Sequence, residues 1–313
     1  MADHSCDNGT APKKILVISF SQSGQLHKIA ASLLAPLRTD MRVKIVEETI
    51  RPVSEYPFPW SAYRFLDAFP EAFRGIPCAL EPPEHSHVRF DLIILAYQVW
   101  YLAPSIPIAS FLQSPRAQEL LKGTPVLTIT ACRNMWLRAH DKVKGYLRAA
   151  DACLVGHIPL TDKAYHLVSV FTMLYWMLTG RKDRMLGFFP APGISDEEIA
   201  RCAAFGQVIA DALSAPNFPD VQDRLNRLST TPILPHLMFL EYRAAKLFDL
   251  WSRWILQRGG QGHPRRRWRT RIFGCSLLCS IVLFSPLLFL LFYATLPFRL
   301  PSVQRQVRDI YYY

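Results

Sequence analysis

The segment with the clearest chemical potential is the hydroxyl-rich sequence SFSQSGQL at residues 19–26. It follows the apolar run ILVI at residues 15–18 and leads into apolar residues spaced as on a helix. A turn between a strand and a helix presents unpaired backbone N–H groups at the helix N-terminus, where the helix dipole also favours an anion. The segment therefore predicts a phosphate-binding loop; the alternative is a capped turn that holds no ligand.

Two familiar classes of site are not indicated by the sequence. The loop lacks the G-K-S/T ending of a Walker loop and the G-x-G-x-x-G pattern of a dinucleotide-binding loop. The seven cysteines contain no C-x-x-C pair, so neither a zinc site nor a redox dithiol is expected. We predict no metal and assign no catalytic residue.

Two further segments should lie beside this loop. Residues 95–108, LAYQVWYLAPSIPI, follow the third predicted strand, and residues 131–136, ACRNMW, follow the fourth. Because parallel strands end at the same edge of a sheet, the three loops should meet at one crevice. Arg133 could oppose negative charge on a ligand, although it could equally be a surface arginine.

The elements that must position these loops alternate between strand and helix. Five strands are predicted by short apolar runs, at residues 15–18, 43–46, 91–96, 125–130 and 152–160. Apolar residues from Leu26 to Leu37 repeat at helical spacing. A capping box from Ser195 to Glu198 opens a last helix that ends near Leu213. This alternation predicts an α/β domain whose doubly wound parallel sheet has helices on both faces.

The first loop resembles the FMN-phosphate loop of the flavodoxin-like family, whose preferred pattern is S/T-x-S/T-G-x-S/T. Ser21, Ser23 and Gly24 match that pattern, whereas Leu26 replaces the last hydroxyl residue. Residues 95–108 are similar to the stretch P-x-Y/W-x-x-x-x-P-x-P of flavodoxin-like quinone reductases, without its leading proline. The resemblance implies a five-stranded parallel sheet in the order 2-1-3-4-5, with FMN as the cofactor. The FMN-binding residues that it implies are Ser21, Gln22, Ser23, Gly24, Gln25, Leu26, Tyr97, Gln98, Val99, Trp100, Tyr101, Ala131, Cys132, Arg133 and Asn134.

A narrower resemblance involves residues 19–37 and the aromatic insertion YPFPWSAYRFLDAFPE at residues 56–71. Both resemble bacterial dialkylresorcinol condensing enzymes of the dialkylresorcinol and aryl-polyene pathways, over roughly residues 13–215. Condensation would need a nucleophilic cysteine with histidine partners, but Cys132 is the only cysteine in the predicted crevice and no histidine-rich loops accompany it. Redox chemistry fits better. The resemblance implies oxidation of a dialkyl cyclohexanedione to the aromatic resorcinol, with FMN accepting the hydride and a pathway ketosynthase as a protein partner.

Two apolar segments suggest how a lipophilic substrate would be enclosed. Residues 56–73 are long for a connection in this fold and could form a hydrophobic lid over an alkyl chain, or a satellite core at the sheet edge. Residues 164–180 carry no charge and could line a lipid-facing entry, or form a buried helix.

The C-terminal part of the chain predicts a membrane anchor. Residues 272–298 contain no charged residue, and about 20 apolar residues are enough for a transmembrane helix. Six arginines precede this run and three follow it, a bias that keeps the preceding side in the cytoplasm, and the same arginines could bind anionic lipid. Residues 237–256 form an amphipathic pattern that suits either an interfacial helix or a helix packed on the domain.

These observations divide the chain into seven segments. They are a disordered N-terminus (1–12), a flavodoxin-like domain with the aromatic insertion (13–214), a linker (215–236), an amphipathic helix (237–256), a basic juxtamembrane segment (257–271), the transmembrane helix (272–298) and a tail (299–313).

The net charge of +11 is concentrated near the C-terminus. Nine arginines and one aspartate follow residue 256, so the preceding part of the chain is nearly neutral and a nucleic-acid partner is not expected.

The sequence MADHSC lacks the features of a signal peptide, so we expect the main domain in the cytoplasm. A single transmembrane helix would anchor it to a bacterial inner membrane. The predicted function is a membrane-anchored FMN-dependent oxidoreductase acting on a lipophilic small molecule. The alternative is a flavin-less scaffold of flavodoxin shape that recruits pathway enzymes to membrane lipid.

Overall fold

The computed structural model of the protein describes residues 11–83, 89–213, 215, 218–229 and 231–311. The segment 1–12, expected to be disordered, lies outside the described residues except for Ala11 and Pro12.

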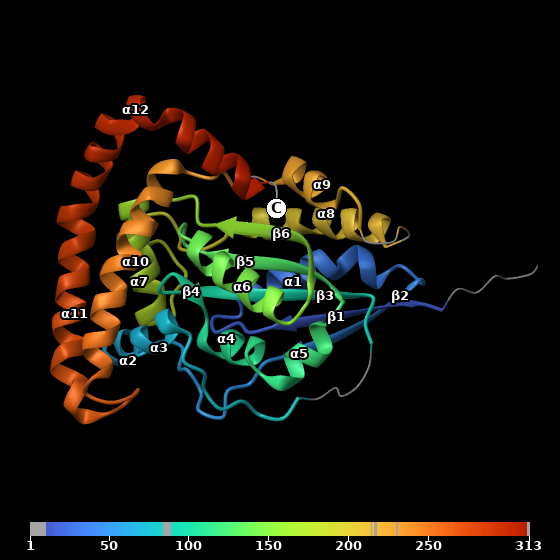
Figure 1. Cartoon of the computed structure of the whole chain (residues 1–313), viewed down its shortest axis with the longest axis horizontal. Helices are drawn as coiled ribbons and strands as arrows, with labels where there is room; N and C mark the ends of the chain where they lie inside the picture. The colour runs from blue at the N-terminus through green and yellow to red at the C-terminus, as the bar shows by residue number, and fades with distance from the viewer. Residues whose placement is uncertain (1–10, 84–88, 214, 216–217, 230, 312–313) are drawn as a thin grey trace, which may run out of the picture.

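A parallel sheet forms the centre of the molecule, as the sequence predicted (Figure 1). Its five parallel strands are β1 (Lys13–Ser19), β2 (Val43–Thr49), β3 (Leu92–Trp100), β5 (Pro125–Cys132) and β6 (Cys153–Thr161). They lie in the order β2-β1-β3-β5-β6, which is the doubly wound order of flavodoxin-like sheets. The expectation of five strands was wrong by one, because β4 (Ala103–Pro104) adds a short antiparallel pairing to the end of β3.

The central strands β1 and β3 carry continuous buried apolar runs because both faces of the sheet are covered there. In β1, Ile15 and Val17 pack into one core while Leu16 and Ile18 pack into the other. The first core contains α1 (Gln25–Arg38), α8 (Asp196–Ala212) and α9 (Val221–Leu228). The second contains α4 (Ile106–Leu112), α5 (Pro115–Leu121) and α6 (Leu137–Ala149).

Local sequence signals explain two of these helices. The hydroxyl of Ser195 accepts a hydrogen bond from the backbone N–H of Glu198, which forms the cap that the sequence predicted for α8. Helices α1 and α8 approach so closely that a Cβ atom on Gly206 would lie 1.9 Å from the carbonyl oxygen of Leu33. Only glycine allows this contact.

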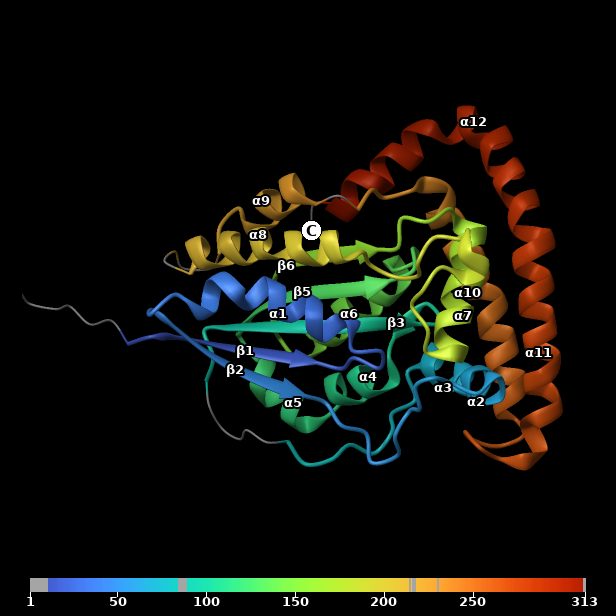
Figure 2. The ribbon, with the colours of Figure 1, turned by 180° about the vertical axis from the view of Figure 1, so that it is seen from behind.

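The remaining helices gather beyond the carboxyl ends of the strands, except for the last part of α12, which runs back over the sheet domain, as Figures 1 and 2 both show. They are α2 (Ala62–Asp67), α3 (Phe69–Arg74), α7 (His166–Thr179), η1 (Met185–Gly187), α10 (Pro235–Leu256), η2 (Pro264–Arg266), α11 (Arg267–Cys279), η3 (Ser280–Phe284) and α12 (Ser285–Tyr311). Helix α10 lies between the sheet domain and the outermost layer, which consists of α11, η3 and α12.

The C-terminal segments differ in detail from the division expected from the sequence. The expected linker 215–236 contains helix α9, and the expected tail continues as helix to Tyr311. The amphipathic segment 237–256 lies within α10, which packs on the domain through Phe248 and Phe69, with ring centroids 5.0 Å apart. Among the described residues, one helix is long and apolar enough to cross a membrane, Pro264–Phe298.

Candidate functional site

A cavity of about 210 Å³ lies at the carboxyl edge of the sheet, where the three loops were expected to meet. It is bounded by the turn between β1 and α1, by the ends of β3 and β5, and by α2 and α7. The lining residues are Gln22, Ser23, Gln25, Leu26, Trp60, Phe65, Ala68, Gln98, Val99, Trp100, Tyr101, Ala131, Cys132, Arg133, Met173, Leu174, Trp176, Met177 and Gly193.

Four of the fifteen expected site residues do not line this cavity. Tyr97 follows Ile93 and Leu95 into the second core, where its hydroxyl lies 3.3 Å from Nδ1 of His140. Asn134 is held by His166, with its Nδ2 3.1 Å from Nδ1 of that residue. The other two residues, Ser21 and Gly24, shape the first loop.

The first loop leaves backbone donors free at the start of α1. Ser21 Oγ accepts a hydrogen bond from the N–H of Leu26 at 3.1 Å, and Gly24 takes the left-handed conformation with φ 78°. Within the described part of the chain, the backbone N–H groups of residues 22–25 have no hydrogen-bond acceptor. Several unpaired donors at a helix N-terminus form an anion site of the kind that binds phosphate.

Two polar atoms in the cavity wall are buried without a partner among the described residues. Gln22 donates from Nε2 to the carbonyl oxygen of Pro57 at 2.9 Å, but its Oε1 has no hydrogen bond. Nε1 of Trp60 is likewise unsatisfied. A buried polar group without a partner costs free energy, so one acceptor and one donor in the same wall fit a ligand with polar edges.

Arg133 gives the cavity a positive charge. Its guanidinium donates to the carbonyl oxygen of His166 at 3.1 Å and to Oγ of Ser169 at 3.3 Å. Burial lowers the pKa of Arg133 to about 10, which leaves it charged at neutral pH. The described residues place no carboxylate within 4.0 Å of it. Burial and the neighbouring Arg133 lower the pKa of His166 to about 3, so this imidazole is neutral.

Cys132 is a poor nucleophile in this environment. Burial raises the pKa of its thiol well above the ordinary value, so the reactive thiolate is not formed near neutral pH. This agrees with the interpretation that the residue borders a binding site and does not form a covalent intermediate.

Aromatic and methionine side chains close the cavity from outside the three loops. They come from residues 56–74, here called the lid, and from α7. The sequence left open the roles of the corresponding segments 56–73 and 164–180. The Trp60 ring lies 5.5 Å from that of Trp100, and the backbone N–H of Trp60 donates to the carbonyl oxygen of Met177 at 2.8 Å. Both segments therefore contribute to the cavity wall.

Gly193 was missed by the sequence analysis. It lies before the capped start of α8, where the Gln25 side chain donates to the carbonyl oxygen of Ile194 at 2.9 Å and accepts from its N–H at 3.1 Å. A Cβ on Gly193 would lie 2.8 Å from both Gln25 and Trp176. The run of proline, alanine, proline and glycine at residues 190–193 is the signal that could have indicated this turn.

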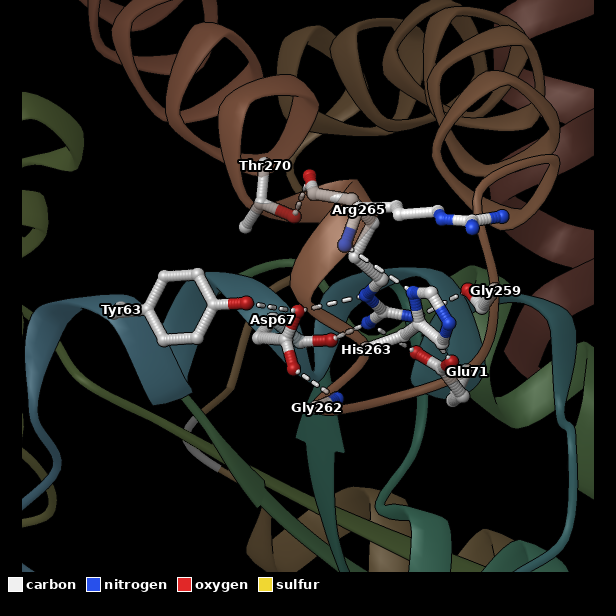
Figure 3. A network of polar contacts seen from close by, with 9 residues as sticks. Tyr63, Asp67, Glu71, Gly259, Gly262, His263, Arg265 and Thr270 are labelled. Atoms are coloured by element: carbon white, nitrogen blue, oxygen red, sulfur yellow. Dashed lines mark hydrogen bonds and ion pairs between the residues drawn. The ribbon is translucent and has the colours of Figure 1, made fainter.

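A buried ionic network holds the lid against the C-terminal segment (Figure 3). The guanidinium of Arg266 donates to Asp67 Oδ1 at 2.7 Å and to both carboxylate oxygens of Glu71, at 2.6 and 2.9 Å. The second oxygen of Asp67 accepts from the N–H of Gly262 at 2.7 Å. Arg266 is 0% exposed, so this arginine, counted above among those flanking the apolar run, is enclosed by protein.

No group of three or more histidine, cysteine, aspartate or glutamate side chains lies close enough together in the described ranges to hold a metal ion.

No family model matches the chain, and neither does any curated protein sequence. Solved structures with partial similarity include a flavoprotein in complex with FMN from Lactobacillus acidophilus, which is 17% identical with a TM-score of 0.38 and covers 48% of this chain and 93% of its own. A flavodoxin from the domain Archaea is 12% identical with a TM-score of 0.35; the match covers 65% of this chain and 99% of the flavodoxin. Flavodoxin 1 from Bacillus cereus is 15% identical with a TM-score of 0.33; the match covers 62% of this chain and 95% of the flavodoxin.

Proposed function

We propose that the protein is an FMN-dependent oxidoreductase that acts on a lipophilic substrate. One observation carries this proposal. The unpaired backbone donors of residues 22–25 open beside a cavity whose wall contains Trp60, Trp100 and Tyr101. A ligand that fits such a site has a phosphate at one end and a flat ring with polar edges at the other. FMN has both parts.

The residues present suit the parts of FMN in distinct ways. The N–H groups of residues 22–25 would hold the phosphate, and the aromatic rings of the lid and of β3 would contact the isoalloxazine. Gln22 Oε1 and Trp60 Nε1 are available for its polar edge. Arg133 would stabilise negative charge that develops near the ring. When bound, FMN would supply the acceptor for a hydride.

The substrate class that we propose is a dialkyl cyclohexanedione. Its aromatisation to a resorcinol removes a hydride and a proton, two electrons in all, with FMN as the oxidant. This proposal is supported by the resemblance of residues 19–37 and 56–71 to dialkylresorcinol pathway proteins, and by the apolar wall that α7 and the lid give the cavity. The proposal includes a pathway ketosynthase as partner and places the domain at the cytoplasmic face of a bacterial inner membrane.

One observation favours a second candidate function, the flavin-less scaffold. The cavity volume of about 210 Å³ is below the range of about 300–1,000 Å³ that is usual for ligand pockets. If the lid and α7 do not move apart, FMN would not fit, and the domain would serve only as a docking body for other proteins.

Matched glycine variants can test FMN binding. Gly24 and Gly123 both have positive φ, 78° and 65°, and a Cβ on either would meet no atom within 4 Å. Gly24 lies in the proposed phosphate loop, whereas Gly123 precedes β5 at the opposite edge of the sheet. Aspartate tolerates this backbone conformation, so Gly24→Asp and Gly123→Asp carry similar strain and equal charge.

The measurement is a titration of detergent-purified full-length protein with FMN and with riboflavin, followed by flavin absorbance. We expect Gly24→Asp to weaken FMN binding about 100-fold, or about 2.7 kcal/mol, because its carboxylate repels the phosphate. Gly123→Asp should bind FMN as the wild type does, and riboflavin binding should be equal in all three proteins. A wild-type protein that takes up no FMN at saturation would support the scaffold instead.

A further inference from the structure

We infer that the apolar helix formed by α11, η3 and α12 lies along the surface of an anionic lipid bilayer and does not cross it. This inference deepens the proposed membrane association and replaces the single pass expected from the sequence. It does not depend on FMN.

The inner side of this helix contacts the protein near both ends of its apolar stretch. Near its start, Phe273 stacks on Phe69 of the lid with ring centroids 3.9 Å apart. Near its end, the Phe292 and Phe239 rings are 5.6 Å apart, and Tyr293 Oη lies 3.2 Å from Nδ1 of His236. The 20 residues between Phe273 and Tyr293 span about 30 Å, the thickness of the hydrocarbon core of a bilayer. A helix crossing the bilayer would carry its packing partners into the hydrocarbon.

Those partners are unsuited to hydrocarbon. Helix α10, which supplies most of them, carries Arg243, Lys246, Asp249 and Arg253. It is also bound to the lid and to the sheet domain, since Asp249 accepts from Arg74 at 2.9 Å and the Glu241 carboxylate accepts from the backbone N–H of Arg138 at 2.6 Å. Charged groups in the centre of a bilayer are expensive and rare. Helix α10 therefore belongs outside the hydrocarbon core, and α11 to α12 must stay beside it.

The end of the chain returns to the side of the helix on which the domain lies. Figures 1 and 2 show α12 bending and running back over the sheet domain. Val303 is 6% exposed, and Ile310 packs beside the cluster of Trp136, Leu137 and Met238. A single pass would place residues 299–311 across the membrane from the domain, where these contacts could not form.

The outer side of the helix has the composition of a membrane-facing surface. Only 11% of its most apolar 18-residue stretch is buried. Its exposed apolar residues include Ile272, Leu278, Leu283, Leu287 and Leu290. At the start of the helix, Trp268 is 49% exposed and stands among the exposed arginines 265, 267 and 271. Tryptophan and arginine suit the headgroup region, and the positive charge favours anionic lipid over an apolar protein partner.

Labelling of two sites on one molecule can distinguish the arrangements. Native Cys153 is exposed on the domain, and Ser302 is exposed beyond the apolar run. The full-length Ser302→Cys protein, with Cys6, Cys275 and Cys279 changed to serine, is reconstituted into phosphatidylcholine–phosphatidylglycerol vesicles. A membrane-impermeant polyethylene glycol maleimide is then added outside, and mass shifts are counted. The same protein with Ser302 retained gives the labelling of Cys153 together with any background from Cys78, Cys132 and Cys202.

We expect each externally labelled molecule to carry label at both Cys153 and position 302. In the contrary result, a molecule is labelled at one site before the vesicles are permeabilised and at the second site only afterwards. That result would show that the helix crosses the bilayer and would overturn the inference. The assay counts thiols and not flavin, so its failure is distinguishable from a failure to bind FMN.

Vesicle flotation tests the lipid as the occupant of the outer face. The double variant Leu287→Glu, Leu290→Glu should lose at least tenfold in binding to these vesicles, whereas Leu228→Glu, a change at an exposed leucine of α9, should bind as the wild type does. Equal binding of all three proteins would overturn the inference. So would a wild-type protein that ignores the vesicles and sediments as a dimer, because a second copy would then cover this face.

Discussion

The ring of Phe69 in the lid lies flat against the ring of Phe273 in α11, with centroids 3.9 Å apart and planes inclined by 12°. Both residues are almost completely buried. Beside them, a Cβ on Gly274 would come within 2.5 Å of Leu66, which shows how closely α11 approaches α2. The wall of the cavity and the apolar helix are therefore one packed unit.

This stacking should contribute strongly to stability. Phe273→Ala removes a buried ring and leaves a cavity, so we expect the free energy of unfolding to fall by about 3–5 kcal/mol. Phe284→Ala in the same helical segment removes a ring that is 55% exposed and should cost less than about 1 kcal/mol. Urea unfolding of the full-length protein in detergent measures both. Similar small losses for the two variants would contradict the role of the stacked pair.

The ionic network makes Arg266 the most sensitive arginine near the lid. Arg266→Met leaves the carboxylates of Asp67 and Glu71 buried without their cation, so we expect a loss of about 3–5 kcal/mol in the same urea assay. Arg265→Met changes an exposed neighbour and should shift stability by less than about 0.5 kcal/mol.

A triple variant separates charge from packing. Adding Asp67→Asn and Glu71→Gln to Arg266→Met removes the uncompensated charges, so part of the lost stability should return. If the triple variant is no more stable than Arg266→Met, unpaired charge is not the cause of the loss.

Glu241 should make stability depend on pH. Burial raises the pKa of this carboxyl to about 7 in the folded protein, against an ordinary value of 4.5. Between these two values the unfolded chain gives up its proton while the folded protein keeps it, so stability falls as the pH rises and levels off above about 7. The expected loss is about 3 kcal/mol. Urea midpoints at several pH values measure it.

Glu241→Gln cannot ionise and should flatten this part of the profile. Glu119→Gln, at an exposed position of α5, should leave the wild-type slope unchanged. A wild-type profile that is flat or rises between pH 4.5 and 7 would show that Glu241 is not the controlling group.

Arg133 should affect ligand affinity more than stability. Arg133→Gln keeps a hydrogen-bond donor but removes the positive charge, so we expect FMN affinity to fall about tenfold, or about 1.4 kcal/mol. The free energy of unfolding without flavin should change by less than about 1 kcal/mol. Arg148→Gln, at an exposed position of α6, is the matched control for both measurements. Equal FMN affinity of the two variants would contradict the electrostatic role.

The sequence was informative where short-range patterns decide the structure. The apolar run at residues 15–18 predicted a central strand, and the order of strands and helices predicted that the loops containing Gln22, Gln98 and Arg133 would share one edge. The direction of Tyr97 could not be predicted. Strand β3 is apolar on both faces, so its pattern does not indicate which core each side chain enters.

The long-range contacts of the lid were also beyond the sequence. Its aromatic composition indicated an unusual insertion, but Asp67 and Glu71 are paired with an arginine nearly 200 residues later in the chain. Arginines before an apolar run usually indicate membrane topology, so the burial of Arg266 had no local signal. Pro297 and Pro301 are a local signal for a bend in α12, but no sequence pattern indicates that the bent helix returns over the sheet domain.

The separation of 195 residues between Glu71 and Arg266 also sets an order of events during synthesis. At a translation rate of about 5–20 residues per second, the arginine leaves the ribosome about 10–40 s after the glutamate. The sheet domain can fold in that interval, while the carboxylates of the lid still lack their cation. The wall of the cavity is therefore completed only when the C-terminal helix has emerged, and the nascent chain acquires its enclosed site and its apolar surface at the same moment.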